Sequence, residues 1–400
     1  MRHIRRPSRP RDVPKRTIAL VALPVVTVLC CPGPVLADTV SPTGAAPALP
    51  VVVSTLDQGA PCRPASDVQA RTPPWTQDML GLSSAWQLTR GAGVLVAVVD
   101  TGVGKDVPGL AGRVSAAGDA GVDCVGHGSF VAGLVAAAPQ PDTGFTGVAP
   151  QARVLAVRGT DERGVATPDS VARGIRAAAD GGASVITVSS ALTTNSDALS
   201  AAVRHARGRD ALVLAAAAPD RTPDGAGSSG PAAYWPAAEP GVLSVAAFGS
   251  GGAEGPVPVP QADLGAPGVG VVSVGPSGSG AFTGSGCSFA AGVVAGTAAL
   301  VRSYRPGLTA DQVSARLLGT AYAARVPRVD PYAAVSGAVP DTVSRTREAA
   351  DPAVIRATRP DGAVATRGRW IAVGSALVVL ALMMGAWVVP QGRARGWRAG

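Results

Sequence analysis

Three short motifs, widely separated in the 400-residue sequence, each carry one side chain suited to nucleophilic catalysis. Asp100 lies in Val-Val-Asp-Thr-Gly-Val, His127 in Gly-His-Gly-Ser-Phe-Val-Ala-Gly, and Ser288 in Gly-Ser-Gly-Cys-Ser-Phe-Ala-Ala-Gly. A serine hydroxyl is a poor nucleophile at neutral pH, so it needs a base, and an imidazole base needs a carboxylate to fix its tautomer. The sequence therefore predicts Ser288 as the nucleophile, His127 as the general base and Asp100 as the group that orients His127.

Each residue also has a simpler interpretation when it is taken alone. Asp100 could cap the turn that follows it, and Ser288 could be only the N-cap of the small-residue helix predicted from Phe289 onward. A single histidine is usually structural, but His3 lies in a predicted targeting segment and His205 lies among arginines on a predicted exposed helix face. The three motifs together favour catalysis over these alternatives.

Short apolar runs alternate with helical segments over the middle of the chain. We expect buried strands near 94–99, 154–157, 185–188, 212–216 and 242–247. Helices are predicted over 127–138, from 168 to about 180, from 197 to 207 and from 310 to 318, the last three opened by capping residues Thr167, Ser196 and Thr309. This alternation predicts an α/β layered domain with a mostly parallel sheet flanked by helices. Asp100 would then follow the first strand, at the sheet edge where α/β sites form.

The two ends of the chain carry apolar segments with different properties. Residues 1–37 combine a basic start, an apolar run broken by Pro24 and small residues before Ala37, which predicts a cleaved signal peptide, although an uncleaved anchor is the alternative. Trp370–Val389 is a run of twenty uncharged residues with tryptophans near both edges, which predicts a transmembrane helix. The predicted organisation is a signal peptide (1–37), an extended arm (38–78), a catalytic domain (79–338), a stalk (339–369), a transmembrane helix (370–389) and a cytoplasmic tail (390–400).

The net charge of +8 comes from the two ends. Residues 1–37 hold seven basic residues and one acidic residue, and residues 390–400 hold three arginines, so the rest of the chain is nearly neutral. The basic composition therefore reflects targeting and topology, and it does not indicate nucleic-acid binding.

Five cysteines become three once Cys30 and Cys31 leave with the signal peptide. Cys62 and Cys124 are the pair outside the serine motif, and an exported chain can form disulfides, so we expect these two to be joined. Two buried free thiols are the alternative. Cys287 would remain a free thiol.

The motifs and their order Asp, His, Ser resemble those of the subtilase superfamily, and the similarity extends from about residue 75 to residue 338. Gly147-Val148-Ala149-Pro150 and Leu264-Gly265-Ala266-Pro267-Gly268 resemble further stretches of that superfamily. Pro74–Gly81 and Leu88–Gly93 resemble the mycosins, the membrane-anchored proteases of type VII secretion systems. The resemblance implies a subtilisin-like fold, a polypeptide substrate and a type VII secretion membrane complex as partner, with no cofactor and no metal.

One departure from the superfamily bears on catalysis. Subtilases place an asparagine after a small-residue strand end, where its amide donates a hydrogen bond to the oxyanion, but this chain has Pro219-Asp220 there. Asn195, the only asparagine in the sequence, lies in another segment. A carboxylate aimed at an oxyanion would repel it.

The sequence therefore predicts an exported serine endopeptidase, held in the cell membrane by one C-terminal helix with its catalytic domain on the extracytoplasmic side and associated with a type VII secretion system. The alternative is a weakly active or inactive protease fold that serves as a structural component of that complex.

Overall fold

The computed structural model describes residues 48–141, 143–221, 233–259, 261–337 and 362–396. The predicted signal peptide and most of the predicted stalk lie outside these residues.

Seven parallel strands form the central sheet, in the order β2-β3-β1-β4-β5-β6-β7. They are β1 (Leu95–Asp100), β2 (Val114–Ala116), β3 (Arg153–Arg158), β4 (Val185–Val188), β5 (Leu212–Ala216), β6 (Leu243–Phe248) and β7 (Leu264–Pro267). Strand β1 pairs with β3 on one side and with β4 on the other. The chain therefore builds the sheet outward in both directions from β1, and the strand order reverses there. Ligands in α/β sheets bind at the carboxyl end of such a reversal, and Asp100 is the last residue of β1.

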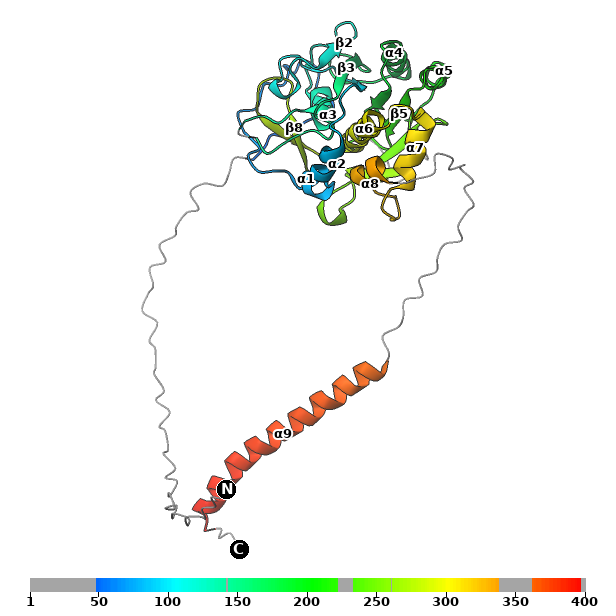
Figure 1. Cartoon of the computed structure of the whole chain (residues 1–400). Helices are drawn as coiled ribbons and strands as arrows, with labels where there is room; N and C mark the ends of the chain where they lie inside the picture. Colours follow the sequence, from blue (N-terminus) through cyan, green and yellow to red (C-terminus); the bar gives the residue numbers. More distant parts are fainter. Residues whose placement is uncertain (1–47, 142, 222–232, 260, 338–361, 397–400) are drawn as a thin grey trace, which may run out of the picture.

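Helices cover both faces of this sheet (Figure 1). The chain forms α1 (Trp75–Met79), α2 (Leu82–Leu88), α3 (His127–Ala136), α4 (Pro168–Asp180), α5 (Asp197–Gly208), α6 (Cys287–Tyr304), α7 (Ala310–Gly319) and α8 (Pro331–Ser336). Short 3₁₀ turns occur at Pro108–Leu110 and Ser250–Gly252, and β8 (Val271–Val274) and β9 (Ala281–Gly284) form an antiparallel hairpin. The predicted α/β fold with a mostly parallel sheet is confirmed.

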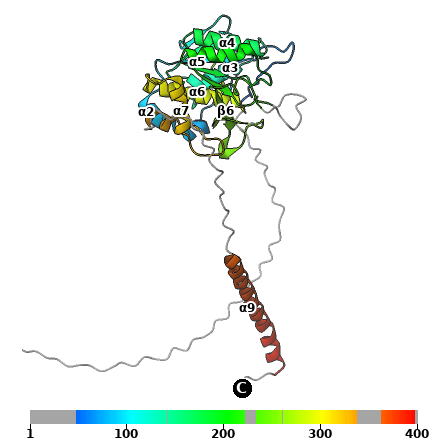
Figure 2. The same ribbon diagram turned by 90° about the vertical axis from the view of Figure 1, so that its right-hand side faces the viewer.

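Alternation along the strands divides the core into two parts. In β1, Val96 and Val98 pack in the cluster that contains α3 and α6, whereas Ala97 and Val99 pack in the cluster beneath α4 and α5. Figure 2 shows α4 and α5 together along the top of the body, with α6 and α7 below them. Helix α6 is long and apolar enough to cross a membrane, but nearly all of it is buried in the core, as expected for the central helix of a layered domain.

Side-chain caps start three of the helices where the sequence predicts them. Thr167 accepts a hydrogen bond from the Ser170 amide, Ser196 from the Leu199 amide, and Thr309 from the Gln312 amide. These bonds satisfy amides that have no partner inside the helix, so they fix where α4, α5 and α7 begin.

The arm preceding α1 is held against the body at several places. The Val52 amide donates to the Thr283 carbonyl (2.9 Å), and the Leu56 amide donates to the Arg163 carbonyl (2.9 Å). Further along, Cys62 is bonded to Cys124, 62 residues away.

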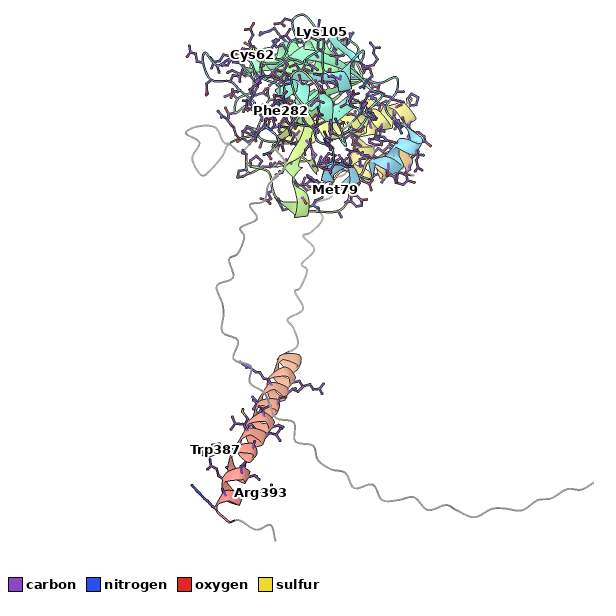
Figure 3. The ribbon with its side chains drawn as sticks, turned by 90° about the vertical axis from the view of Figure 1, so that its left-hand side faces the viewer. Cys62, Met79, Lys105, Phe282, Trp387 and Arg393 are labelled. Carbon is purple, nitrogen blue, oxygen red and sulfur yellow. A yellow bond between two sulfur atoms is a disulfide. The ribbon has the colours of Figure 1, made fainter. Side chains whose placement is uncertain are left out.

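The C-terminal helix α9 runs from Gly362 to Ala394 and includes the uncharged segment predicted to cross the membrane. Within it, Arg367–Ala394 has the length and composition of a membrane span, and its large apolar side chains are exposed. The helix begins before Trp370 and continues past Pro390, as far as the basic residues near its end, where Trp387 and Arg393 are labelled in Figure 3. Exposure of an apolar helix to water is unfavourable, so this surface fits a lipid environment.

Candidate active site

Three elements bring the predicted catalytic residues together. Asp100 ends β1, His127 is the first residue of α3, and Ser288 is the second residue of α6. Gly126, the N-cap of α3, has a φ of 90°, a conformation that glycine adopts at little cost and that sets the direction from which His127 enters the site. His127 is thereby placed in contact with Asp100, 27 positions before it, and with Ser288, 161 positions after it.

The distances between these side chains suit nucleophilic catalysis. His127 Nδ1 lies 2.9 Å from Asp100 Oδ1 and 2.8 Å from Oδ2, and His127 Nε2 lies 3.1 Å from Ser288 Oγ. All three residues are buried, and the amide of Thr101 also donates to Asp100 Oδ1 (2.6 Å). With a proton on Nδ1 held by Asp100, Nε2 of a neutral His127 can accept the proton of Ser288.

Packing fixes the plane of the imidazole. The Phe289 ring lies 5.0 Å from the His127 ring, and the Phe130 ring lies 4.7 Å from that of Phe289. Phe289 follows Ser288 directly, so α6 supplies both the nucleophile and the ring that packs against His127.

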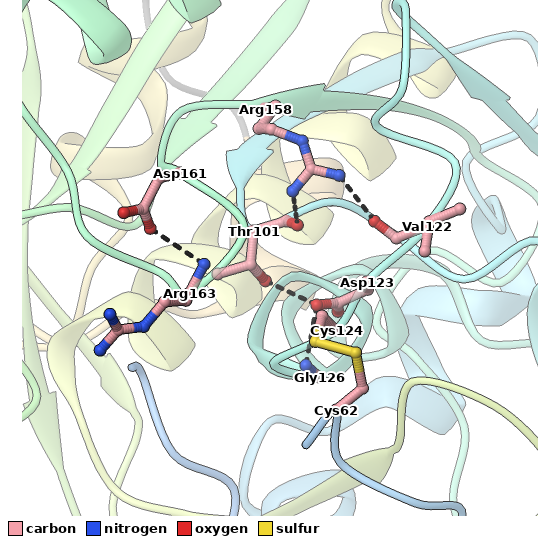
Figure 4. The surroundings of a disulfide bond; sticks show 9 residues. All are labelled: Cys62, Thr101, Val122, Asp123, Cys124, Gly126, Arg158, Asp161 and Arg163. Atoms are coloured by element: carbon pink, nitrogen blue, oxygen red, sulfur yellow. Dashed lines mark hydrogen bonds between the residues drawn. A yellow bond between two sulfur atoms is a disulfide. The ribbon is translucent and has the colours of Figure 1, made fainter. Parts of the chain in front are cut away.

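Asp123 holds the segment that leads to His127, and sequence reasoning did not identify it. Its carboxylate accepts from Thr101 Oγ1 (2.8 Å), the Gly126 amide (2.8 Å), and the Ser129 amide (2.8 Å) and hydroxyl (2.7 Å). Figure 4 shows Asp123 next to the Cys62–Cys124 bond, with its links to Thr101 and Gly126. The only sequence signal was a carboxylate four residues before His127. Asp123 therefore ties the end of β1 to the start of α3.

A fourth polar side chain, Asp220, enters the site from the segment after β5. Its Oδ2 lies 2.8 Å from His127 Nε2 and accepts from Ser288 Oγ (2.5 Å), while its Oδ1 accepts from the Ser288 amide (3.0 Å). The sequence predicted that position 219 or 220 would replace the oxyanion asparagine, and Asp220 is the residue that does so. Asn195 is bound elsewhere, since its amide donates to Glu239 Oε1 (2.6 Å).

The charges around the imidazole set its protonation. Burial alone would lower the pKa of His127, but the charges and hydrogen bonds of Asp100 and Asp220 outweigh burial and hold this pKa well above its ordinary value. Burial would likewise raise the pKa of Asp100, yet the charge and hydrogen bond of His127 lower it. The two aspartates on either side of the ring therefore favour the protonated form of His127.

Two grooves meet at His127 and Asp220. One is lined by Ser189–Leu192, Val165 and Ala166, and the other by Thr283–Ser285 and Phe289. The first groove combines the polar side chains of Ser189 and Ser190 with the apolar side chains of Val165 and Leu192. Ser54 of the arm lines both grooves, so the arm borders the site.

The sequence matches the Peptidase_S8 (subtilase family) profile over residues 91–355. This match covers more than half of the chain, and the fold and the site geometry described above agree with it. The chain belongs to the subtilase family and is a serine endopeptidase.

Individual relatives within the subtilase family narrow the classification of this chain. Mycosin-3 of Mycobacterium tuberculosis (strain ATCC 25618 / H37Rv) is 37% identical over 341 residues, which cover 68% of this chain and 73% of that protein. The structure of the MycP3 protease from the type VII (ESX-3) secretion system matches 74% of this chain and 100% of its own, with a TM-score of 0.58 and 32% identity. A chain of the intact ESX-5 inner membrane complex matches 86% of this chain and 100% of its own, with a TM-score of 0.61 and 27% identity. These similarities place the chain among the mycosins.

Proposed function

We propose that the chain is a membrane-anchored endopeptidase in which Ser288 attacks the peptide carbonyl, His127 transfers the proton and Asp100 holds the imidazole. The observation that carries this proposal is the continuous set of contacts from Asp100 through His127 to Ser288. These contacts, together with the match to the subtilase family, favour the enzyme over an inactive structural component.

Ser288 Oγ attacks the scissile carbonyl carbon while its proton passes to His127 Nε2. The carbonyl π electrons move to oxygen, and the Ser288 amide donates a hydrogen bond to it. His127 then protonates the leaving amine as the C–N bond breaks. Water attacks the acyl-enzyme with the same proton transfers, and Ser288 is restored.

A fluorophosphonate probe tests these roles, because it reacts covalently with an activated serine and requires no knowledge of the cleaved sequence. The full-length chain in detergent should be labelled, and Ser288→Ala should abolish labelling. Ser336→Ala changes a serine at the end of α8 and serves as the matched control, which should be labelled like the unaltered chain. Equal labelling of the Ser288→Ala variant would disprove the assignment.

We propose further that α9 anchors the protein in the cell membrane, that the catalytic domain lies on the extracytoplasmic side, and that the substrate is a polypeptide handled by a type VII secretion complex. Support comes from the apolar surface of α9 and from the similarity to a chain of the ESX-5 inner membrane complex. The predicted signal peptide gives the orientation.

Proteinase added to intact spheroplasts tests the orientation. The catalytic domain should be digested while a membrane-bound fragment containing α9 remains. Protection of the domain until the membrane is lysed would reverse the proposed topology. Co-purification of the full-length chain with the secretion complex of its own host would test the association separately.

A further inference from the structure

The carboxylate of Asp220 occupies the position where the oxyanion would form. Its Oδ1 accepts a hydrogen bond from the Ser288 amide, the backbone donor that the oxyanion needs, and its Oδ2 accepts a hydrogen bond from the Ser288 hydroxyl. The side chain is only 11% exposed, and a Cβ at Gly286 would overlap it. Asp220 is therefore built into the site and does not merely lie at its edge.

An ionised Asp220 in this position opposes the reaction in two ways. It keeps the shared proton on His127, which then cannot act as a base, and it places negative charge against the carbonyl oxygen that must become negative. A catalytic arrangement therefore has to change the protonation of this pair.

Among the described titratable groups around Asp220, His127 is the one that can give it a proton. His127 faces it from α3, with Asp100 of β1 on the far side of the ring, and Arg221 lines the adjoining groove. Cys287 of α6 is a neutral thiol, because burial, with the charge of Asp220 in addition, raises its pKa to about 12. The proton between His127 Nε2 and Asp220 Oδ2 is thus the one that decides the state of the site.

We propose that Asp220 is a further catalytic residue, which acts as a carboxylic acid and donates a hydrogen bond to the oxyanion with the proton that it shares with His127. This inference rests on the proposed function, since it concerns the same hydrolytic site.

The required change conserves protons. When a substrate carbonyl enters, the shared proton moves from His127 Nε2 to the Asp220 carboxylate, which gives a neutral base and a neutral acid. Ser288 Oγ bonds to the carbonyl carbon, its proton goes to His127, and the carbonyl π electrons move to oxygen, where the Ser288 amide and the Asp220 O–H donate. Buried carboxylic acids can serve as such donors. His127 then protonates the leaving amine, and water completes hydrolysis.

The pair then gives a pH dependence opposite to that of an ordinary triad. Asp220 and His127 must together hold one proton, so the activity of the unaltered chain should fall as pH rises and that proton is lost. Asp220→Asn supplies a permanent donor and needs only a neutral imidazole. Its activity should rise with pH and reach a plateau.

The test compares fluorophosphonate labelling rates of the full-length chain in detergent, from about pH 5 to about pH 9, the range in which a histidine and its partner titrate. The variants are Asp220→Asn, Asp220→Ala and Asp311→Asn, the last removing an exposed carboxylate on α7 as the matched control. At the alkaline end Asp220→Asn should react faster than the unaltered chain, on the order of 10²-fold. At the acidic end the unaltered chain should exceed Asp220→Ala, because only it has an acid to donate.

The possible results distinguish the acid role of Asp220 from the proposed peptidase function. If the labelling rate of the unaltered chain rises with pH in parallel with Asp220→Asn, or never exceeds that of Asp220→Ala, the acid role of Asp220 is wrong while the proposed function stands. If no variant is labelled at any pH, the proposed function fails and the inference fails with it. Nitrogen NMR of His127, one of three histidines, should also show that Asp220→Asn lowers the pKa of its imidazole.

Discussion

Loss of the Cys62–Cys124 bond should lower the free energy of unfolding, and the number of residues between the two cysteines determines by how much. The bond closes a loop with a sequence separation of 62 residues. The entropy lost by the unfolded chain on closing such a loop corresponds to about 4 kcal/mol of folding stability. An unfolding entropy of about 2.1 cal/mol/K per residue over residues 48–337 amounts to about 0.6 kcal/mol/K, so the melting temperature should fall by about 7 °C.

Replacement of both cysteines by serine, followed by thermal unfolding with and without reductant, measures this effect. The unaltered chain should lose about 7 °C when it is reduced, whereas Cys62→Ser/Cys124→Ser should melt at the lower temperature in both conditions. Cys287→Ala is the control, since it removes the buried free thiol and should respond to reductant as the unaltered chain does. A difference of less than about 2 °C between oxidised and reduced protein would show that the arm adds no such constraint.

Two further perturbations test the packing and the charges at the site. Phe289→Ala should lower the free energy of unfolding by about 3–5 kcal/mol, and it should also slow labelling of Ser288 because the His127 ring loses the ring it packs against. Phe282→Ala, which removes a buried ring on β9, should destabilise the protein while slowing labelling less. Equal effects of the two variants on labelling would contradict the positioning role of Phe289. The stability contributed by His127 should be fully present below its ordinary pKa of 6.5 and should decline as pH rises through its raised pKa. Urea unfolding at a series of pH values measures this decline. The same dependence of the free energy of unfolding on pH in Asp220→Asn would mean that Asp220 does not contribute to the raised pKa of His127.

Local sequence signals predicted much of the fold. The strands at 185–188 and 212–216 were predicted with their observed bounds, because buried parallel strands are continuous apolar runs bounded by turn residues. Capping residues located the start of three helices, since the cap bond is a local interaction. The short strand at 114–116 and the hairpin at 271–284 were not predicted. The strand at 114–116 pairs with β3, which is distant in sequence, whereas β8 and β9 pair with each other across a short loop. All three strands are too short to carry a clear pattern of their own.

The site was predictable where a motif surrounded each residue, and it was not where position depended on the fold. Asp100, His127 and Ser288 meet as the sequence predicted. Asp220 was noted as the replacement for an amide, but its bonds to both His127 and Ser288 depend on where the segment after β5 enters the site. Asp123 lies in an irregular loop, and its donors are Thr101, which follows β1, Gly126, which precedes α3, and Ser129 within α3.

The burial of α3 and α6 has a consequence for how the protein loses activity. Every residue of α3 and all but two of α6 are buried, and these two helices carry His127 and Ser288 on their first turns. Backbone amides in such helices exchange with solvent only when the whole domain opens, whereas an active site built on surface loops can open by itself. The base and the nucleophile should therefore stay in register until the core itself unfolds, and heat inactivation should coincide with global melting.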